Sequence, residues 1–506
     1  DEFSREIKTE VIDPNGLTIS SIDKIRMPHT GIVWPYNYIV RDINEKVVRA
    51  DGKFSELTID ASGKKIQSED NGGRIEFDYY SSGKLKSTKV NGQITSEMTY
   101  DDFGNQLSLK EMNSGVTSYE YDVLGQLIYQ KDARNKESFE FKYDENGNLL
   151  SKIVDGTEYN YEYFQAGTDG AGKLKRAAVQ NGISYDYSYD LNGHLIRKEE
   201  NITPLKSFKT FYKYDSKGRL ELEIYDSNFE LETKYHPSTG YVDRISEMGS
   251  YLDFFTGKRQ NALGQWTSYS LLGLGNTTKS YDELNRPMMI STPGVYERNY
   301  KFELISSNLL SKENPLTGVL ETYDYGQNNL DRLEKIFLNG QLELNTVYNT
   351  SGNITTKTDA GKFNYHPSKK HAVVVVDNPN GNIQTSLQTI EYDALQNPIL
   401  ILEDDVEWRF HYGPFHQRKR VEIIDNNTGI SKERFYTGNT EYEIDQSGEE
   451  VYRVEYISGG DGLYALRISD NSTINFYGVH TDYLGSIESL SDENGGLFFE
   501  QSFNAW

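Results

Sequence analysis

The chain has 506 residues, and its 77 acidic residues outnumber its 53 lysines and arginines, so the formal net charge is −24. This charge argues against a general basic face for nucleic acid or for an anionic membrane, and no apolar run long enough for a membrane-spanning helix occurs. The absence of cysteine excludes disulfides, thiolate metal sites and cysteine nucleophiles. The 38 tyrosines exceed the 22 phenylalanines and 4 tryptophans together. This excess favours partly solvent-exposed aromatic surfaces over a fully buried apolar core.

The first 75 residues predict β-structure, because turn signals such as DPNGL (13–17) and ADGKF (50–54) separate short apolar stretches. The opening DEFSREIKTE is charged and has no apolar signal-peptide core. An export signal therefore lies upstream, or export does not use one. This segment either begins the structure that follows or caps it.

From residue 76 onward, the motif Tyr-Asp-x-x-Gly recurs, and successive motif tyrosines from Tyr80 to Tyr235 lie between 20 and 26 residues apart. Degraded copies follow, such as YNTSG at Tyr348 and YDALQNP at Tyr392. Such a period identifies a repeat protein. The clearest copies place the motif at Tyr100, Asp101, Gly104, Tyr121, Asp122, Gly125, Tyr143, Asp144, Gly147, Tyr189, Asp190, Gly193, Tyr214, Asp215 and Gly218.

One repeat is predicted to be one β-hairpin. Aromatic residues alternate before each Asp, as in Phe141 and Tyr143, and this period of two indicates a strand with its rings on one face. Asp followed three residues later by Gly predicts a type I turn with a bulge. Leu127, Leu149 or Leu195 then begins the return strand. Since a lone hairpin is marginal in water, neighbouring hairpins must stack to bury the rings.

The acidic stretch Asp144-Glu145-Asn146 before Gly147 raises the question of a calcium loop. An EF-hand loop needs Gly at its sixth position. If Asp144 is the first position of the loop, Gly147 is the fourth. Sister copies read DVLG, DLNG and DSKG, so only the Asp and the Gly recur. The repeat therefore predicts a turn and no metal site here.

Two architectures accommodate hairpins at this spacing. A propeller would use two of these repeats for each four-stranded blade, whereas a continuous sheet would add hairpin after hairpin without a blade boundary. The irregular spacing and the lack of alternation between odd and even copies favour the continuous sheet, but they leave the propeller open. No twelve-residue segment shows helical periodicity with caps, so the predicted fold is all-β.

The copies YDVLGQL, YDENGNL and YDSKGRL resemble the YD repeats of the Rhs family, which also occur in the C subunits of bacterial Tc toxin complexes and in teneurins. FHYGPFHQRKR, from Phe410, is similar to a Tyr-Gly-Pro-x-x-x-Arg segment of that family. HTDYLGS, residues 480–486, looks like the signature of the Rhs-associated core, with His480, Asp482, Leu484, Gly485 and Ser486 in the matching places. The resemblance covers residues 75–506.

The resemblance implies a continuous spiralling sheet of YD hairpins that closes into a hollow shell, with the core region plugging one end. It divides the chain into an N-terminal β segment (1–75), a YD-repeat shell (76–405) and an Rhs-associated core (406–506). In the family, the shell encloses a C-terminal toxin that self-cleavage releases just after the core. This chain ends at Trp506, before that cleavage segment, and Asn504 stands where Asp is common, so the resemblance assigns no catalytic residue here.

The residues give no strong sign of catalysis, metal or cofactor. His236 and His366 repeat one turn position, His411 and His416 are expected on opposite faces, and His480 is expected to pack within the core region. No acidic pair stands out as a glycosidase site, and phosphate-loop, dinucleotide and Gly-x-Ser-x-Gly motifs are missing from the sequence. We expect a non-enzymatic protein without a cofactor.

The leading hypothesis is therefore a secreted or cell-surface bacterial shell of an Rhs-like polymorphic toxin, which houses and isolates its own C-terminal effector. A delivery apparatus is a further expected partner, whereas nucleic acid and a membrane span are not expected. The competing hypothesis is a cell-surface YD-repeat protein whose tyrosine rows bind glycans or other cells. An autoprotease or hydrolase ranks third.

Overall fold

The structure of this chain is a computed structural model that describes most residues between 6 and 503. The described ranges are 6–12, 18–26, 33–41, 44–49, 52–60, 62–133, 138–204, 206–326, 330–378, 381, 388–459, 462–470 and 472–503, with the backbone alone up to residue 49 and at 274. The predicted turn at 13–17, Asn504 and Trp506 lie outside them. All regular structure in these ranges is β-strand, and no helix occurs in them, so the all-β prediction is confirmed.

The chain divides into two compact units, each built from segments distant in sequence. The first unit contains residues 1–136, 281–288 and 299–384, and the second contains 137–280, 289–298 and 385–506. Two strands, β26 (Pro287–Thr292) and β27 (Tyr296–Phe302), contribute residues to both. The three-part division inferred from the family resemblance remains a prediction.

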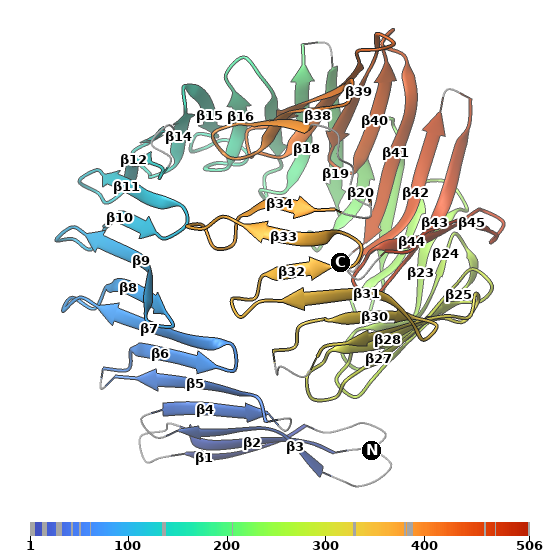
Figure 1. The fold of residues 1–506 in the computed structure, drawn as a ribbon. Coiled ribbons are helices and arrows are strands. Elements are labelled where there is room, and N and C mark those ends of the chain that lie inside the picture. Colours follow the sequence, from blue (N-terminus) through green and yellow to red (C-terminus); the bar gives the residue numbers. More distant parts are fainter. Residues whose placement is uncertain are drawn as a thin grey trace. The chain divides into compact units, whose positions relative to one another are not determined.

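Strands of the first unit follow one another as antiparallel neighbours (Figure 1). They are β1 (Glu6–Ile12), β2 (Thr18–Arg26), β3 (Val33–Arg41), β4 (Asn44–Arg49), β5 (Phe54–Ile59), β6 (Lys65–Asp70), β7 (Gly73–Tyr79), β8 (Leu85–Val90), β9 (Gln93–Tyr100), β10 (Gln106–Glu111), β11 (Gly115–Tyr121), β12 (Leu127–Lys131), β28 (Leu309–Asn314), β29 (Val319–Asp324), β30 (Lys335–Leu338), β31 (Gln341–Tyr348), β32 (Ile354–Lys357), β33 (Gly361–Tyr365) and β34 (Val373–Asp377).

The second unit carries further repeat strands and a separate eleven-stranded sheet, β35–β45, which we call the C-terminal sheet. The repeat strands are β13 (Ser138–Tyr143), β14 (Leu149–Val154), β15 (Thr157–Tyr163), β16 (Leu174–Val179), β17 (Ser184–Tyr189), β18 (Leu195–Thr203), β19 (Lys206–Tyr214), β20 (Leu220–Ile224), β21 (Glu230–Tyr235), β22 (Val242–Glu247), β23 (Asp253–Gln260), β24 (Trp266–Leu271) and β25 (Leu274–Tyr281). The C-terminal sheet comprises β35 (Gln388–Tyr392), β36 (Pro398–Glu403), β37 (Val406–Tyr412), β38 (Arg418–Asp425), β39 (Ile430–Thr437), β40 (Thr440–Asp445), β41 (Glu450–Gly459), β42 (Gly462–Asp470), β43 (Ile474–Thr481), β44 (Ile487–Ser491) and β45 (Leu497–Glu500).

The hairpin expected from each repeat is confirmed. Strand β13 ends at Tyr143 and the return strand β14 begins at Leu149, with Phe141 opposite Lys152 and a register shift at Tyr143 where the bulge was expected. Consecutive strands pair in order through the described repeats, which is the continuous-sheet arrangement and not a set of separate blades.

The aspartate of each motif organises its turn. Oδ1 of Asp144 accepts hydrogen bonds from the backbone N–H groups of Asn146 (2.9 Å) and Asn148 (2.8 Å). The N–H of Gly147 donates to the Asp144 carbonyl at 3.0 Å, and Gly147 has φ of 84°, a conformation that side chains disfavour. The hydrogen bond from the Asn148 side chain, together with these backbone donors, lowers the pKa of Asp144. The acidic stretch is a turn.

Tyrosines link each repeat to the one before it. The Tyr214 hydroxyl donates to the carbonyl of Leu195 at 2.9 Å, and Leu195 is the first residue of the preceding return strand. The same bond recurs at the strand-ending or nearby tyrosines Tyr163, Tyr189, Tyr235, Tyr325, Tyr365 and Tyr412. Adjacent hairpins are therefore joined by a side chain as well as by the backbone ladder.

A side chain from the preceding turn stacks on the same rings. The residue four positions after the motif Asp lies against the next tyrosine: the His194 ring stacks on Tyr214 at 4.7 Å, and the Arg219 guanidinium lies 4.1 Å from the centre of Tyr235. Cation–π contacts of this kind add to the hydroxyl bond. At Tyr100, Lys84 Nζ in the same position lies 5.9 Å from the ring centre, and the ring also packs edge-on against Tyr80.

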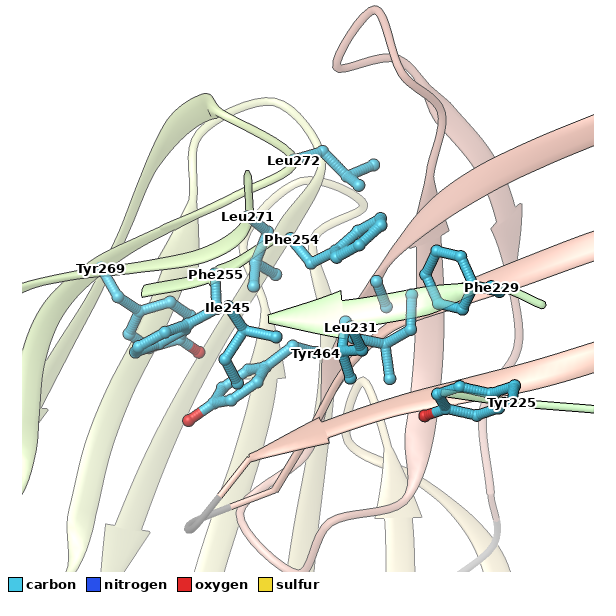
Figure 2. Close-up of a cluster of buried hydrophobic side chains, with 12 residues drawn as sticks. Tyr225, Phe229, Leu231, Ile245, Phe254, Phe255, Tyr269, Leu271, Leu272 and Tyr464 are labelled. Atoms are coloured by element: carbon cyan, nitrogen blue, oxygen red, sulfur yellow. The ribbon is translucent and has the colours of Figure 1, made fainter. Parts of the chain in front are cut away.

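The largest apolar cluster lies in the second unit (Figure 2). Phe254 and Phe255 of β23 are fully buried, and the Phe255 ring stacks on Tyr464 of β42 with centroids 4.1 Å apart. Leu231 of β21 and Ile245 of β22 complete the side of the cluster that comes from the repeats. This core therefore joins repeat strands to the C-terminal sheet.

Replacing Tyr214 by Phe removes the hydroxyl that bonds to Leu195 and keeps the stacked ring. We expect Tyr214→Phe to lower the free energy of unfolding by about 1 kcal/mol, the net contribution of one neutral hydrogen bond. Urea unfolding followed by tyrosine fluorescence measures this change. The control is Tyr251→Phe, because Tyr251 is fully exposed at 105%, and an equal effect of both substitutions would contradict the role assigned to the hydroxyl.

Candidate functional site

The candidate site is the contact between the C-terminal sheet and the repeat strands within the second unit. It combines two apolar clusters with a set of buried charged groups. In the second cluster, Phe208 of β19 packs against Phe435 of β39 and Tyr442 of β40, with ring centroids 5.8 Å apart in both contacts. An apolar contact alone would allow the two layers to slide, whereas charged groups fix a register.

Glu488 makes the most deeply buried ionic contact. This residue of β44 is 0% exposed, and its Oε2 accepts hydrogen bonds from Arg298 Nε at 2.7 Å and from the Tyr296 hydroxyl at 2.9 Å. Both donors belong to β27, and Arg298 is itself 3% exposed. The carboxylate thus ties the C-terminal sheet to a repeat strand.

Glu455 and Glu200 repeat the arrangement elsewhere on the same contact. Glu455 of β41 is 0% exposed, pairs with Arg467 of β42 and accepts from Ser227 in the turn between β20 and β21. Glu200 of β18 bonds to Lys419 of β38 at 2.7 Å. Burial lowers the pKa of Lys419, and the neighbouring Glu200 counteracts that shift. Each carboxylate therefore contacts both layers.

The HTDYLGS segment forms the end of β43 and the turn that follows it. His480 is buried at 4%, its Nε2 lies 3.0 Å from Ser491 Oγ, its Nδ1 lies 3.3 Å from Thr292 Oγ1, and its ring stacks on Tyr296. Burial lowers the pKa of His480 to about 4, so the ring is neutral at pH 7. His480 therefore contacts the repeat strands as well as its own sheet.

The other signature residues build a turn of the repeat type. Asp482 Oδ1 accepts from the N–H groups of Leu484 (2.9 Å) and Ser486 (2.8 Å), and Gly485 has φ of 92°. The Leu484 side chain is exposed. The structure thus places His480 in the buried contact and leaves Asp482, Leu484, Gly485 and Ser486 in the turn.

A second titratable group lies on the tyrosine-bearing face of the repeats. Glu223 of β20 is opposite Tyr212 of β19, is half-buried and has no hydrogen-bond partner among the described residues. Burial raises its pKa to about 7. Burial and the charge of Glu223 also raise the pKa of Tyr212. This face is therefore polar and aromatic, and Glu223 on it is only partly ionised near neutral pH.

The remaining histidines do not gather. Nδ1 of His236 accepts from the N–H of Thr239 at 3.2 Å, and Nδ1 of His366 accepts from that of Ser368 at 3.2 Å, so both replace the motif Asp as predicted. His411 Nε2 lies 2.8 Å from Glu422. Within the described ranges, no three His, Asp or Glu side chains are placed to hold a metal ion.

Sequence reasoning did not single out Glu200, Glu455 or Glu488. It drew attention to the acidic stretch Asp144-Glu145-Asn146, which is a turn, and Asp492 proves to be another turn residue that accepts from Asn494 and Gly496. The available signal was a lone Glu within an apolar strand, as in SIESLS around Glu488. Such a residue is costly to bury without a partner, which makes it informative.

Comparisons with known proteins agree with this geometry. A family model described as Teneurin YD-shell matches residues 56–208. The solved structure of TcdB2-TccC3-Cdc42 superposes on 99% of this chain and 30% of that one, with a TM-score of 0.79 at 14% identity. Residues 56–208 therefore resemble a YD-shell, and the fold of the whole chain is similar to that of this toxin structure. The Photorhabdus luminescens Tc holotoxin pore gives the same coverage and TM-score.

Two nucleases are similar over part of their length. The tRNA3(Ser)-specific nuclease WapA of Bacillus spizizenii is 28% identical over 202 residues, which are 39% of this chain and 8% of that protein. The tRNA nuclease WapA of Bacillus subtilis is 27% identical with the same coverage. The YD-repeat chain thus spans a small part of these relatives and less than a third of the toxin chains. No helix in the described residues is long and apolar enough to cross a membrane.

Removing one partner of the Glu488 contact should strongly destabilise the second unit. Arg298→Met leaves a buried carboxylate without its cation, so we expect a loss of about 3–5 kcal/mol in the free energy of unfolding of the second unit. Combining it with Glu488→Leu should recover most of that loss. Thermal unfolding measures both variants. The exposed pair Lys110–Glu97 provides the control, since Lys110→Met should cost less than about 1 kcal/mol; comparable losses would refute the buried-charge argument.

The depressed pKa of His480 predicts acid sensitivity. Between about 4, its folded pKa, and 6.5, its ordinary value, the unfolded chain binds a proton that the folded chain does not. Stability from this group is therefore complete above pH 6.5 and declines as the pH falls toward 4. Urea unfolding at a series of pH values should show a shallower decline for His480→Gln than for the wild type. If the free energy of unfolding of both proteins declines equally with falling pH, a group other than His480 causes the loss of stability in acid.

Proposed function

We propose that this chain is the non-enzymatic encapsulating shell of an Rhs-like polymorphic toxin, which houses and isolates an effector polypeptide attached at its C-terminal side. The contact of the C-terminal sheet with the repeat strands is the observation that carries the proposal. Glu488 and Glu200 form ion pairs across that contact, and Glu455 accepts a hydrogen bond from Ser227 across it, as expected of a plug that stays in place. A protein that only displayed repeats would not need such a device.

The composition of the tyrosine-bearing face suits an enclosed polypeptide. Tyr187 and Tyr212 are half-buried, and burial raises the pKa of both. Aromatic rings with polar edges contact varied side chains without a fixed register. Because its pKa is raised to about 7, Glu223 carries a weaker average charge at neutral pH than an ordinary carboxylate would. The proposed partner is thus the effector, with a delivery apparatus acting on the whole assembly.

The similarity to parts of TccC3-containing toxins and of the WapA nucleases supports a role in a larger toxin. We infer that any enzymatic activity resides in the attached effector and that the assembly is secreted or surface-exposed. The alternative is a cell-surface YD-repeat protein that binds glycans or other cells. That alternative does not require the C-terminal sheet to be held in a fixed position against the repeat strands.

Protease protection tests encapsulation. An unfolded reporter segment with one protease site is attached after Trp506, and the rate of its cleavage is compared with that of the same segment attached before Asp1. We expect cleavage at the C-terminal position to be slower by about tenfold or more, because an enclosed segment is reached only by opening of the shell. In Arg298→Met, which loosens the C-terminal sheet, protection should decrease. Equal cleavage at the two positions would reject encapsulation.

A further inference from the structure

A cavity of about 780 Å³ lies in the first unit, apart from the site described above. Strand and turn residues from two stretches of the chain line it. One stretch runs from β6 to β11 and includes Gln93 and Asn113, and the other runs from β30 to β34 and includes Arg332 and Lys370. A bond from Lys370 Nζ to Gln93 Oε1, 2.6 Å long, joins the two sides.

The basic side chains of this cavity have neutral partners. Arg332 donates to the Asn349 carbonyl and lies over the Tyr348 ring, and the His371 ring lies 2.6 Å from Asn353 Oδ1. None of Arg332, Lys370 and His371 has a carboxylate within ion-pair distance among the described residues. Although the chain has a net charge of −24, these basic side chains therefore have no ion-paired acid beside them within the described residues.

Hydroxyl and amide groups make up much of the remaining wall. The Thr88 hydroxyl lies 2.9 Å from that of Thr95 and 2.6 Å from that of Ser96, which forms a row of groups able both to donate and to accept. Asn91 uses its Oδ1 for the backbone N–H of Arg74. Glu111 is the single acidic residue among the described lining residues, and it accepts from Ser114.

These features restrict the ligand. A volume near 780 Å³ is within the range of small-molecule sites, but the described lining contains no Phe, Tyr or Trp side chain and only Val90 and Met112 as apolar side chains, unlike sites for drug-like or base-containing ligands. Uncompensated cations select an anionic group, and the hydroxyl and amide rows select several ligand hydroxyls. An acidic peptide would satisfy the cations but would leave the hydroxyl row without matching partners.

We propose that this cavity binds an acidic saccharide, that is, a sugar of one or two rings carrying a sulfate, phosphate or carboxylate group. Arg332, Lys370 and His371 hold the anionic group, and the Thr88 row with Asn113 holds the sugar hydroxyls. The proposal is independent of encapsulation, because it concerns a different unit and a different set of residues.

Titration calorimetry on the full chain, with a monosulfated disaccharide as the probe, tests this site. We expect measurable binding, and we expect Lys370→Gln to weaken it about tenfold because a charge-assisted contact is lost. The matched control is Lys362→Gln in the neighbouring strand β33, which removes the same charge outside the cavity and should leave the affinity unchanged. Equal losses in the two variants would indicate general electrostatic attraction and would overturn the proposal.

A second set of probes separates a sugar site from a simple anion site. Asn113→Ala should weaken the sulfated disaccharide about fivefold, the effect of one lost neutral hydrogen bond, and leave inorganic sulfate unaffected. The unsulfated disaccharide should bind more weakly than the sulfated one. Inorganic sulfate or a short glutamate peptide binding as tightly as the disaccharide would refute the saccharide assignment, and so would an Asn113→Ala variant with full disaccharide affinity.

Discussion

The hydrogen bonds from backbone N–H groups to the motif aspartate are the constraint on which the rest of the structure depends. At Asp215, Oδ1 accepts from the N–H groups of Lys217 and Arg219, which closes the turn and fixes where the return strand begins. The same turn positions the Arg219 side chain over Tyr235 of the next repeat. One side chain thus sets both the hairpin and its link to the following hairpin, so register is passed along the chain locally.

Local register alone does not hold the C-terminal sheet in place, and the buried carboxylates meet that need. Replacing a buried ion pair by apolar residues is often neutral or stabilising, so the value of Glu488 and Arg298 is better sought in the unique position that they specify. The pair of Glu200 and Lys419 imposes the same requirement at a second point, and the hydrogen bond from Ser227 to Glu455 adds a third contact between the layers. Three such contacts hold the C-terminal sheet in a single position against the repeat strands. A purely apolar contact would permit several positions.

The sequence was sufficient for everything that repeats. The strand ends at Tyr143 and Leu149, the positive φ of Gly147 and the turn role of His236 all follow from rules that act within a few residues. Contacts between distant segments could not be predicted from the sequence. Nothing within ten residues of Glu488 indicates that Arg298 will meet it, because the pairing depends on how a whole sheet folds back on the repeats. The same limit hid the cavity lined by Gln93 and Lys370.

Degeneracy of the repeat then explains how one scaffold can hold unrelated features. The turn uses a side-chain acceptor such as Asp or His and a residue that tolerates positive φ, and Asn285 and Gln396 satisfy the second condition where Gly is missing. Positions between them are free to vary, which is how a basic turn at Lys369 and Lys370 arises in a strongly acidic chain. Since such a turn costs the fold little, positive charge without an ion-paired acid beside a hydroxyl-lined cavity is better explained by a ligand than by stability.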